Sequence, residues 1–225
     1  MQACNAFCPD IIGHPWKGKD LNASTIRDLV SFSRSFDVVL VGNGIEKNQT
    51  RYLRPLIEKL LALHPCVVLD ATAFDALDFP LHMKSNPQAI LLPHVGEFKR
   101  WSGIDVRKLK INARMKLLRK IIGKNNLVIN LKDWQSVIAG KNFAYVNHTG
   151  NPGMAKGRFG DVLAGLTSGF WAQGMGAFDA ASCAAWLNGK MGDTLKEKKW
   201  YGYIASDLLD EIKNWKSNHP FFKSE

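Results

Sequence analysis

The sequence contains little cysteine, and what it has is poorly placed for structural bridges or metals. Cys4, Cys8, Cys66 and Cys183 are the four cysteines among 225 residues, too few for the disulfide framework that stabilises small secreted domains. Cys4 and Cys8 lack a second Cys or His pair at the spacing of a structural zinc site. The cysteines therefore exclude a disulfide scaffold and argue against bound zinc.

Long apolar runs and targeting signals are also missing. The most apolar region, residues 162–187, is interrupted by Ser168, Gln173, Asp179 and Ser182, whereas a membrane-spanning helix needs about 20 consecutive apolar residues. The N-terminus lacks the positively charged start and apolar core of a secretory signal. We therefore expect a reduced, soluble, cytoplasmic protein without a membrane partner.

Acidic residues are in the minority. The chain has 20 Asp and Glu against 30 Lys and Arg, a formal net charge of +10, which suits anionic partners and says little about the fold. The basic residues are scattered, and those of residues 108–124 follow the polar side of one expected helix. We interpret them as an ordinary solvated face, so nucleic acid is not an expected partner.

Internal repeats, low-complexity tracts and linkers are absent as well, which favours one domain over residues 1–225. Short apolar runs alternate with segments of helical spacing, and helices dominate the last third. Such an order is typical of an α/β fold with a mostly parallel central sheet that helices cover on both faces. Strands are expected within residues 37–44, 66–74 and 126–147, and residues 89–101 are expected to form a strand that leads through a loop to a helix. Helices are expected within residues 24–36, 48–64, 106–125, 161–174, 178–198 and 203–215, the first of them capped by a Ser or Thr.

Four segments carry unusual residues where ligands bind to a parallel sheet, beyond the carboxyl ends of the strands. Three of them, residues 41–44, 93–98 and 131–137, leave expected strands, and the fourth is the glycine-rich stretch 151–174. Although these segments lie far apart in the sequence, a parallel sheet places all of them along one edge.

The glycine-rich stretch combines Gly157 and Gly160 with Asp161 directly before an expected helix. A loop that ends at a helix start presents free backbone N–H groups and the positive end of the helix dipole to an anion. Asp161 can either cap this helix or accept a proton from a hydroxyl as a general base. The stretch is not a Walker A loop, because no Gly-Lys-Ser/Thr follows.

Three further candidates have both a chemical and a structural interpretation. His94 is either a ligand contact or a residue that packs or caps a helix. Glu97 either holds a metal-bound water near phosphates or simply starts the following helix. Lys132 either neutralises a phosphate or is solvent-exposed, as most lysines are.

Seven stretches, in order from Asp37 to Lys213, resemble the ADP/ATP-dependent NAD(P)H-hydrate dehydratases, a branch of the ribokinase-like superfamily. The most specific pair is "PHVGEF" followed by "NPGMAKGRFGDVLAG"; the others are "DVVLVGNG", "VVLDATAF", "LKDWQSVIAG", "AAWLNGKMGD" and "YIASDLLDEI". The resemblance implies a single ribokinase-like domain of the carbohydrate-kinase type. It also implies repair of hydrated NADH or NADPH: ATP or ADP with Mg²⁺ phosphorylates the ring hydroxyl, and phosphate is then eliminated.

The resemblance also implies roles for particular residues. Asp161 would be the catalytic base and would contact the substrate, and Gly157 and Gly160 would form the anion-stabilising loop. Gly44 and His94 would contact the hydrated dinucleotide, and Glu97 would lie near Mg²⁺ through water. The residues that would line the adenine nucleotide are Lys132, Asp133, Trp134, Gln135 and Ser136.

The sequence departs from the family pattern at several positions. Arg158 and Phe159 replace the middle glycine and the hydroxyl residue of the usual Gly-Gly-Ser/Thr-Gly-Asp, which either narrows the phosphate cradle or, through Arg158, adds a positive charge. The usual Gly-Pro-Gly-Leu-Gly reads "GNGIE", so that Glu46 is its last residue, and Asn188 stands where a His is common.

The family's usual first strand, glycine-rich loop and helix are not recognisable before Cys8. We therefore expect an exposed sheet edge and either a homo-oligomer whose neighbouring subunit covers the site or a shortened, inactive relative. Three functions stay open: a hydrated-NAD(P)H dehydratase, another small-molecule kinase of the superfamily, and a nucleotide-binding or assembly protein without catalysis.

Overall fold

The computed structural model describes residues 10–14, 21–81, 83 and 88–214. Its centre is one six-stranded sheet in which the strands follow one another in chain order. The strands are β1 (Val39–Val41), β2 (Cys66–Leu69), β3 (Gln88–Leu91), β4 (Leu127–Leu131), β5 (Ser136–Ala139) and β6 (Ala144–Asn147). The first four strands are parallel, and β5 and β6 continue the sheet antiparallel. The prediction of a mostly parallel sheet is therefore confirmed.

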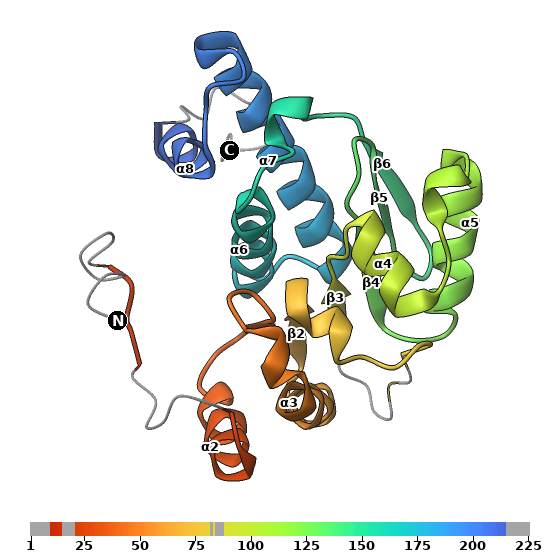
Figure 1. The fold of residues 1–225 in the computed structure, drawn as a ribbon, viewed down its shortest axis with the longest axis vertical. Helices are drawn as coiled ribbons and strands as arrows, with labels where there is room; N and C mark the ends of the chain where they lie inside the picture. Colours follow the sequence, from red (N-terminus) through yellow and green to blue (C-terminus); the bar gives the residue numbers. More distant parts are fainter. Residues whose placement is uncertain (1–9, 15–20, 82, 84–87, 215–225) are drawn as a thin grey trace.

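Helices cover both faces of this sheet, as predicted (Figure 1). The helices are α2 (Ala23–Ser33), α3 (Thr50–Leu63), α4 (Val95–Ser102), α5 (Ile111–Ile122), α6 (Phe159–Ala172), α7 (Ala177–Lys199) and α8 (Ala205–Asn214). Apolar side chains of α2, α3, α4 and α5 form the core on one face, and those of α6 and α7 form the core on the other. A third cluster joins α6, α7 and α8.

The strands show why short apolar runs belong in the middle of such a sheet. In β2, Val67 and Leu69 face the α3 side, whereas Val68 faces the α6–α7 side, and all three are fully buried. In β4 all five residues are buried. Because successive side chains of a strand point to opposite faces, a strand covered on both faces is mostly apolar along its whole length; the polar Asn130 of β4 is an exception and is fully buried.

Several element boundaries differ from the sequence prediction. Asn22, and not a Ser or Thr, caps α2: its side chain accepts hydrogen bonds from the main-chain N–H groups of Ser24 and Thr25. The helix expected over 106–125 begins as a separate 3₁₀ turn, Val106–Lys108, and α5 starts only at Ile111. Asp105 caps the start of that 3₁₀ turn through the N–H of Arg107, and the extended residues Leu109 and Lys110 separate the turn from α5.

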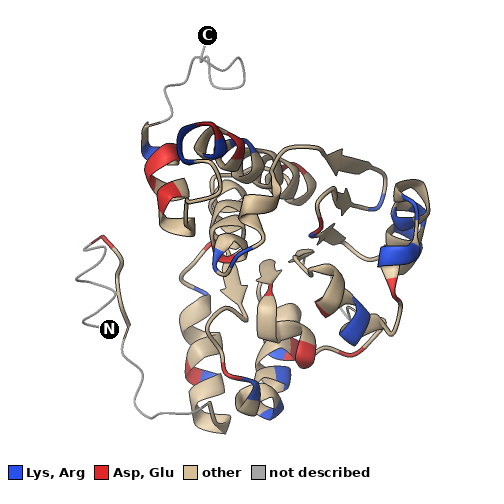
Figure 2. Ribbon diagram, turned by 45° about the horizontal axis from the view of Figure 1, so that its top comes forward, with Lys and Arg blue, Asp and Glu red and all other residues tan. Residues whose placement is uncertain are grey.

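The basic face of the expected helix is present on α5. Lys116, Arg119 and Lys120 are exposed, whereas Leu118 and Ile122 face the core. Figure 2 shows α5 on the outside of the molecule, and Arg114 is the basic residue of this helix that departs from the predicted solvated face, because it is buried. Among the helices of the described residues, none is both long and apolar enough to cross a membrane.

Among the described residues β1 lies at one edge of the sheet, with β2 as its neighbour and Leu40 partly exposed; the open edge itself stays a prediction. The expectation that the family's first strand–loop–helix unit is absent concerns residues before Cys8, which lie outside the described ranges. It stays a prediction, as does the single domain over residues 1–225.

Candidate active site at the carboxyl ends of the strands

The segments singled out from the sequence meet at one edge of the sheet, as expected for parallel strands. Asn43 follows β1, Asp70 follows β2, His94 precedes α4 after β3, and Lys132 follows β4. Asp161 reaches the same place from the first turn of α6. A parallel bridge between His94 and Lys132 extends the pairing of β3 and β4 to this edge.

Lys132 and Asp70 form the buried ionic centre of the site. The Lys132 Nζ lies 2.5 Å from Asp70 Oδ1, and the two side chains are only 18% and 2% exposed. Glu97 Oε2 lies 3.9 Å from the same ammonium group. A Cβ placed on Gly160 would lie 3.5 Å from the Lys132 Nζ, so the cation stands beside the first turn of α6. Two carboxylates therefore surround one cation at the start of that helix.

Asp161 is not the cap of α6. The helix begins at Phe159, so Asp161 is its third residue, and it is exposed. Its Oδ1 accepts a hydrogen bond of 2.6 Å from the side-chain amide of Asn43. Of the two interpretations left open by the sequence, the structure removes the cap and leaves an exposed carboxylate on the first turn of a helix.

Arg158 does not line the cavity in front of α6, whereas Phe159 forms part of its wall. Arg158 precedes the helix in the left-handed conformation, with φ of 74°, so the loop keeps the backbone geometry for which glycine is the usual residue. Phe159 is 4% exposed and packs edge-to-face on Tyr203 with ring centroids 5.7 Å apart. Its ring belongs to the core between α6, α7 and α8. The presence of Arg158 and Phe159 at positions where the family usually has small residues has therefore not closed the phosphate cradle.

His94 and Glu97 both cap α4. The His94 Nδ1 accepts hydrogen bonds from the N–H groups of Gly96 and Glu97, and the Glu97 carboxylate accepts one from the His94 N–H. Because Nδ1 is an acceptor, the imidazole proton lies on Nε2. Burial, with Lys132 and Arg100 nearby, lowers the pKa of His94. Burial raises the pKa of Glu97, with Lys132 opposing the rise.

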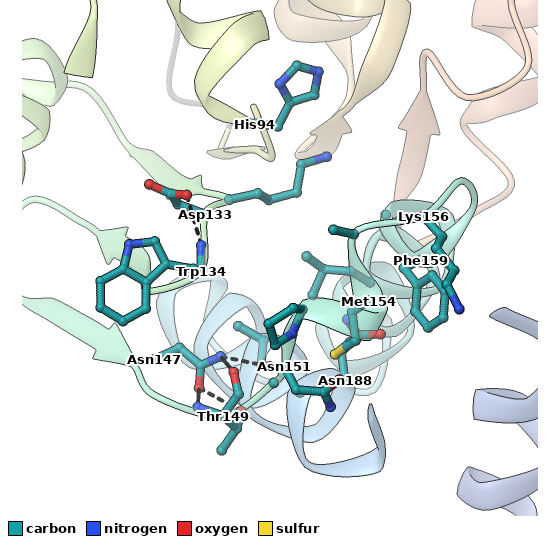
Figure 3. A pocket seen from close by; sticks show the side chains of 18 residues that line it. His94, Asp133, Trp134, Asn147, Thr149, Asn151, Met154, Lys156, Phe159 and Asn188 are labelled. Carbon is teal, nitrogen blue, oxygen red and sulfur yellow. Dashed lines mark hydrogen bonds between the residues drawn. The ribbon is translucent and has the colours of Figure 1, made fainter. Parts of the chain in front are cut away.

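A cavity of about 790 Å³ opens beside this centre, within the 300–1,000 Å³ range of small-molecule sites. His94 lies on one side of it and a group of polar side chains on the other, with Trp134 and Phe159 towards its two ends (Figure 3); Lys132 also lines the cavity. The polar side chains are Asn147, Thr149, Asn151 and Asn188. Trp134 is 76% exposed, whereas Asn188 is 7% exposed and its Oδ1 has no hydrogen-bond partner among the described residues.

Glycines of α7 let the chain pass close to that helix at the cavity wall. A Cβ on Gly189 would lie 2.2 Å from Thr149 Oγ1, and one on Gly192 would lie 2.2 Å from Met154 Sδ. Thr149 also donates a hydrogen bond to the main-chain oxygen of Trp186. The glycines in "AAWLNGKMGD" thus bring residues 149–154 against α7 and shape this wall.

The loop after β4 is held from behind. Buried Arg114 of α5 donates a 2.6 Å hydrogen bond to Asp133, which also accepts from the N–H of Trp134. Ser136 Oγ donates to the Asp133 main-chain oxygen, and Gln135 contacts His148. Buried Arg114 therefore holds the loop in place, and the Trp134 side chain of this loop lines the cavity.

Not every residue predicted for the site lines this cavity. His94, Lys132, Asp133, Trp134 and Gly160 line it. Gln135, Ser136 and Gly157 lie outside its lining, and so does Gly44, which occupies a left-handed turn after β1 with φ of 73°. Asp161 and Glu97 border the ionic centre beside it.

Two central residues were missed by sequence reasoning. Asp70 and Asn43 each follow a strand at the same edge as the predicted segments. Asp70 could have been recognised in the sequence, because it is a polar residue that directly follows the apolar run in "VVLD". Asn147, at the end of β6, and Thr149 were missed as well, because β6 is antiparallel and the parallel-edge rule does not apply to it. Asn151 begins the predicted stretch 151–174 but was not named as a site residue.

A pre-formed metal centre is not evident: in the described part of the chain no three His, Cys, Asp or Glu residues group as ligands. Magnesium that serves phosphate chemistry does not need such a group. It is usually bound by one or two carboxylates together with phosphate oxygens and water. Glu97, beside the cavity wall, fits that kind of contact.

Fold and site together define a class of protein: an α/β kinase-type fold with an acid on the first turn of a helix and a nucleotide-sized cavity beside it. The model of the family described as NAD(P)H-hydrate dehydratase matches residues 1–214. The chain belongs to this family. The predicted family and its ribokinase-like fold are thereby confirmed.

Individual relatives agree with this assignment. The chain is 32% identical over 212 residues to a bifunctional NAD(P)H-hydrate repair enzyme of Pyrobaculum aerophilum, with 93% of this chain and 41% of that protein covered. It is 29% identical to an ADP-dependent (S)-NAD(P)H-hydrate dehydratase of Nitrosopumilus maritimus, with 94% and 73% covered. The chain thus spans about two-fifths of the length of the first of these relatives.

A solved structure is similar as well. The ADP/ATP-dependent NAD(P)H-hydrate dehydratase of Bacillus subtilis, co-crystallised with ATP/Mg²⁺, superimposes with a TM-score of 0.68 at 27% identity. The match covers 80% of this chain and 65% of that one.

Proposed function

We propose that the chain dehydrates hydrated NADH or NADPH at the expense of ATP or ADP. The observation that carries the proposal is the exposed Asp161 carboxylate on the first turn of α6, beside Gly160, Lys132 and a cavity of about 790 Å³. The names of the relatives, a hydrated-NAD(P)H repair enzyme and an ADP-dependent dehydratase, support the same substrate class.

Asp161 acts as the general base. Its carboxylate takes the proton of the ring hydroxyl, and the hydroxyl oxygen attacks the terminal phosphorus of the nucleotide, whose bond to the bridging oxygen breaks. The phosphorylated ring carbon then loses phosphate with its bonding electron pair, a ring proton departs, and the double bond returns. The result is the reduced dinucleotide, inorganic phosphate and a nucleotide shortened by one phosphate.

The start of α6 stabilises the charge of the transferred group. The first N–H groups of a helix have no partner within it, and here they stand beside Gly160 together with the Lys132 ammonium group. Preorganised donors of this kind lower the energy of the developing negative charge. Gly157 supplies a further main-chain segment that a phosphate can approach closely.

The adenine nucleotide occupies the cavity along Lys132, Asp133 and Trp134, and Gln135 and Ser136, outside the lining, follow these residues directly in the chain. Trp134 has an exposed ring face suited to stacking on a base. The hydrated dinucleotide lies on the β1 side of Asp161, against Gly44, and contacts the His94 side chain, whose Nε2 lies 3.4 Å from Glu97 Oε1.

Magnesium supplies charge neutralisation on the phosphate oxygens when it is bound. Glu97 would hold it through water. Burial raises the pKa of the Glu97 carboxyl, and bound magnesium would place a positive charge near this carboxyl. A homo-oligomer and a cytoplasmic location belong to the proposal as well.

The test is incubation of hydrated NADH with ATP or ADP and Mg²⁺, with recovery of the reduced-nicotinamide absorbance as the readout. Asp161→Asn is expected to lower kcat by about 100-fold or more, the usual contribution of a general base. Asp179→Asn is the matched control, because Asp179 is also an exposed third residue of a helix, α7. It is expected to leave kcat unchanged.

The outcomes separate the three functions. Equal recovery with Asp161→Asn and the wild-type chain contradicts the proposed base. A stable phosphorylated product without ring restoration indicates another small-molecule kinase. Nucleotide binding by calorimetry without turnover of any hydroxyl substrate indicates a binding protein without catalysis.

A further inference from the structure

The turn after β1 brings one side-chain amide between two carboxylates. Gly42, with φ of 122°, lies so close to the main chain of Asp70 that a Cβ would come within 1.8 Å of the Asp70 carbonyl oxygen. Any side chain at this position is therefore excluded. The close approach places the next residue, Asn43, at the carboxyl end of β2 and opposite the start of α6.

The Asn43 amide contacts both acids. Its Nδ2 donates a 2.9 Å hydrogen bond to Asp70 Oδ2 and a 2.6 Å hydrogen bond to Asp161 Oδ1. A primary amide has two N–H donors on one nitrogen, so each carboxylate receives one of them. Asp70 is in turn paired through its other oxygen with the Lys132 ammonium group. One chain of contacts thus runs from the cation through Asp70 and Asn43 to Asp161.

The orientation of the amide is fixed by these partners. Both neighbours can only accept when ionised, so the nitrogen must face them and the oxygen must point away. The Asn43 Oδ1 is buried there without a hydrogen-bond partner among the described residues. An unpaired buried polar atom is unfavourable, so among the described residues the hydrogen bonds that favour this orientation are those to the two carboxylates.

We propose that Asn43 is a positioning residue that holds the Asp161 carboxylate at the angle required to receive the substrate proton. The proposal rests on the function proposed for Asp161. Asn43 does this in two ways: it fixes Oδ1, leaving Oδ2 of Asp161 for the hydroxyl, and it separates two anions that would otherwise face each other. In the family pattern quoted above, this position is a proline, which has no side-chain donor.

The first experiment compares steady-state kinetics of Asn43→Ala and the wild-type chain in the dehydration assay. Loss of orientation acts on the chemical step, so kcat is expected to fall about 10- to 100-fold, with little change in the KM for the nucleotide. Asn43→Asp, which keeps the shape and replaces both donors with a third anion, is expected to lose more. Asn48→Ala is the matched control, since exposed Asn48 donates to Glu46 in the same loop.

The second experiment does not depend on activity. The melting temperature is measured for wild type, Asn43→Ala, Asp161→Ala and the double variant. If the amide holds Asp161 and shields it from Asp70, Asn43→Ala lowers the melting temperature more in the wild-type background than in Asp161→Ala, because the repelling carboxylate is then gone.

The two experiments distinguish failure of the inference from failure of the proposed function. An active wild type with unchanged kcat in Asn43→Ala overturns the positioning role and leaves the function standing. An inactive wild type with the expected coupling in melting temperature removes the function and leaves the amide–carboxylate contact. Additive melting temperatures overturn the contact itself. A rise in nucleotide KM at constant kcat assigns Asn43 to binding and overturns positioning.

Discussion

Arg158 offers a test of the loop in front of α6 that needs no substrate. Its φ of 74° and ψ of −9° place an L-amino acid in the left-handed region at the helix start. The side chain makes no capping hydrogen bond to α6 and is exposed. The surrounding structure therefore imposes the conformation without a local compensating contact, and Arg158→Gly is expected to stabilise the protein.

The magnitude follows from two opposing contributions. The left-handed conformation costs a non-glycine residue about 1–2 kcal/mol, whereas glycine in the unfolded chain has extra freedom equivalent to about 0.5–1 kcal/mol. The balance is a gain of about 0.5–1 kcal/mol in the free energy of unfolding. For a chain of this size this corresponds to a rise in melting temperature of about 1–4 °C.

Differential scanning calorimetry of the wild type, Arg158→Gly and Arg158→Ala measures the effect. Arg158→Ala removes the same side chain and keeps a Cβ in the strained conformation, so it is not expected to raise the melting temperature. An equal rise in both variants would show that the arginine side chain, and not the backbone conformation, is unfavourable. A fall in Arg158→Gly would refute the strain argument.

Two further predictions concern the supports of the site. Protonation of His94 Nδ1 breaks the α4 cap, and burial lowers the pKa of His94 in the folded protein. The unfolded state therefore binds this proton more readily than the folded state. The free energy of unfolding consequently falls as the pH drops below about 6.5. His94→Asn keeps a cap and is expected to flatten this decline in melting temperature between pH 7.5 and pH 5, whereas an unchanged slope would exclude His94 as its source. Arg114→Met leaves the Asp133 carboxylate without its 2.6 Å partner and is expected to cost about 2–3 kcal/mol in urea unfolding, somewhat below the loss for a fully buried pair. Adding Asp133→Asn is expected to recover part of that loss; no recovery would mean that the arginine acts through packing alone.

The local pattern of the chain was enough to predict most elements and their order. The helix of residues 48–64 ends before Pro65 because the residue before a proline disfavours helical conformation, and α3 ends at Leu63. The boundary of α2 differed because Asn22, a single side chain, caps the helix, and that of α5 differed because Leu109 and Lys110 are extended; the apolar period reveals neither.

The candidate site was predictable in part for the same reason. His94, Lys132 and Asp161 stand next to strand ends or at a helix start, and such positions are visible in the sequence. Their partners are not: Asp161 meets Asn43 across 118 positions, and Lys132 meets Asp70 across 62. Those contacts depend on which strands become neighbours and on how the side chains turn.

The amino-acid sequence by itself determined the alternation of strands and helices, the family pattern and the acid at the start of α6, because these follow from local periodicity and from short motifs. Only the tertiary structure decided that Phe159 packs on Tyr203 in the core between α6, α7 and α8, at the wall of the cavity. It also decided that one amide joins two acids at the edge of the sheet. The physical reason is the same in both cases: packing and charge pairing act between segments that only the folded chain brings together.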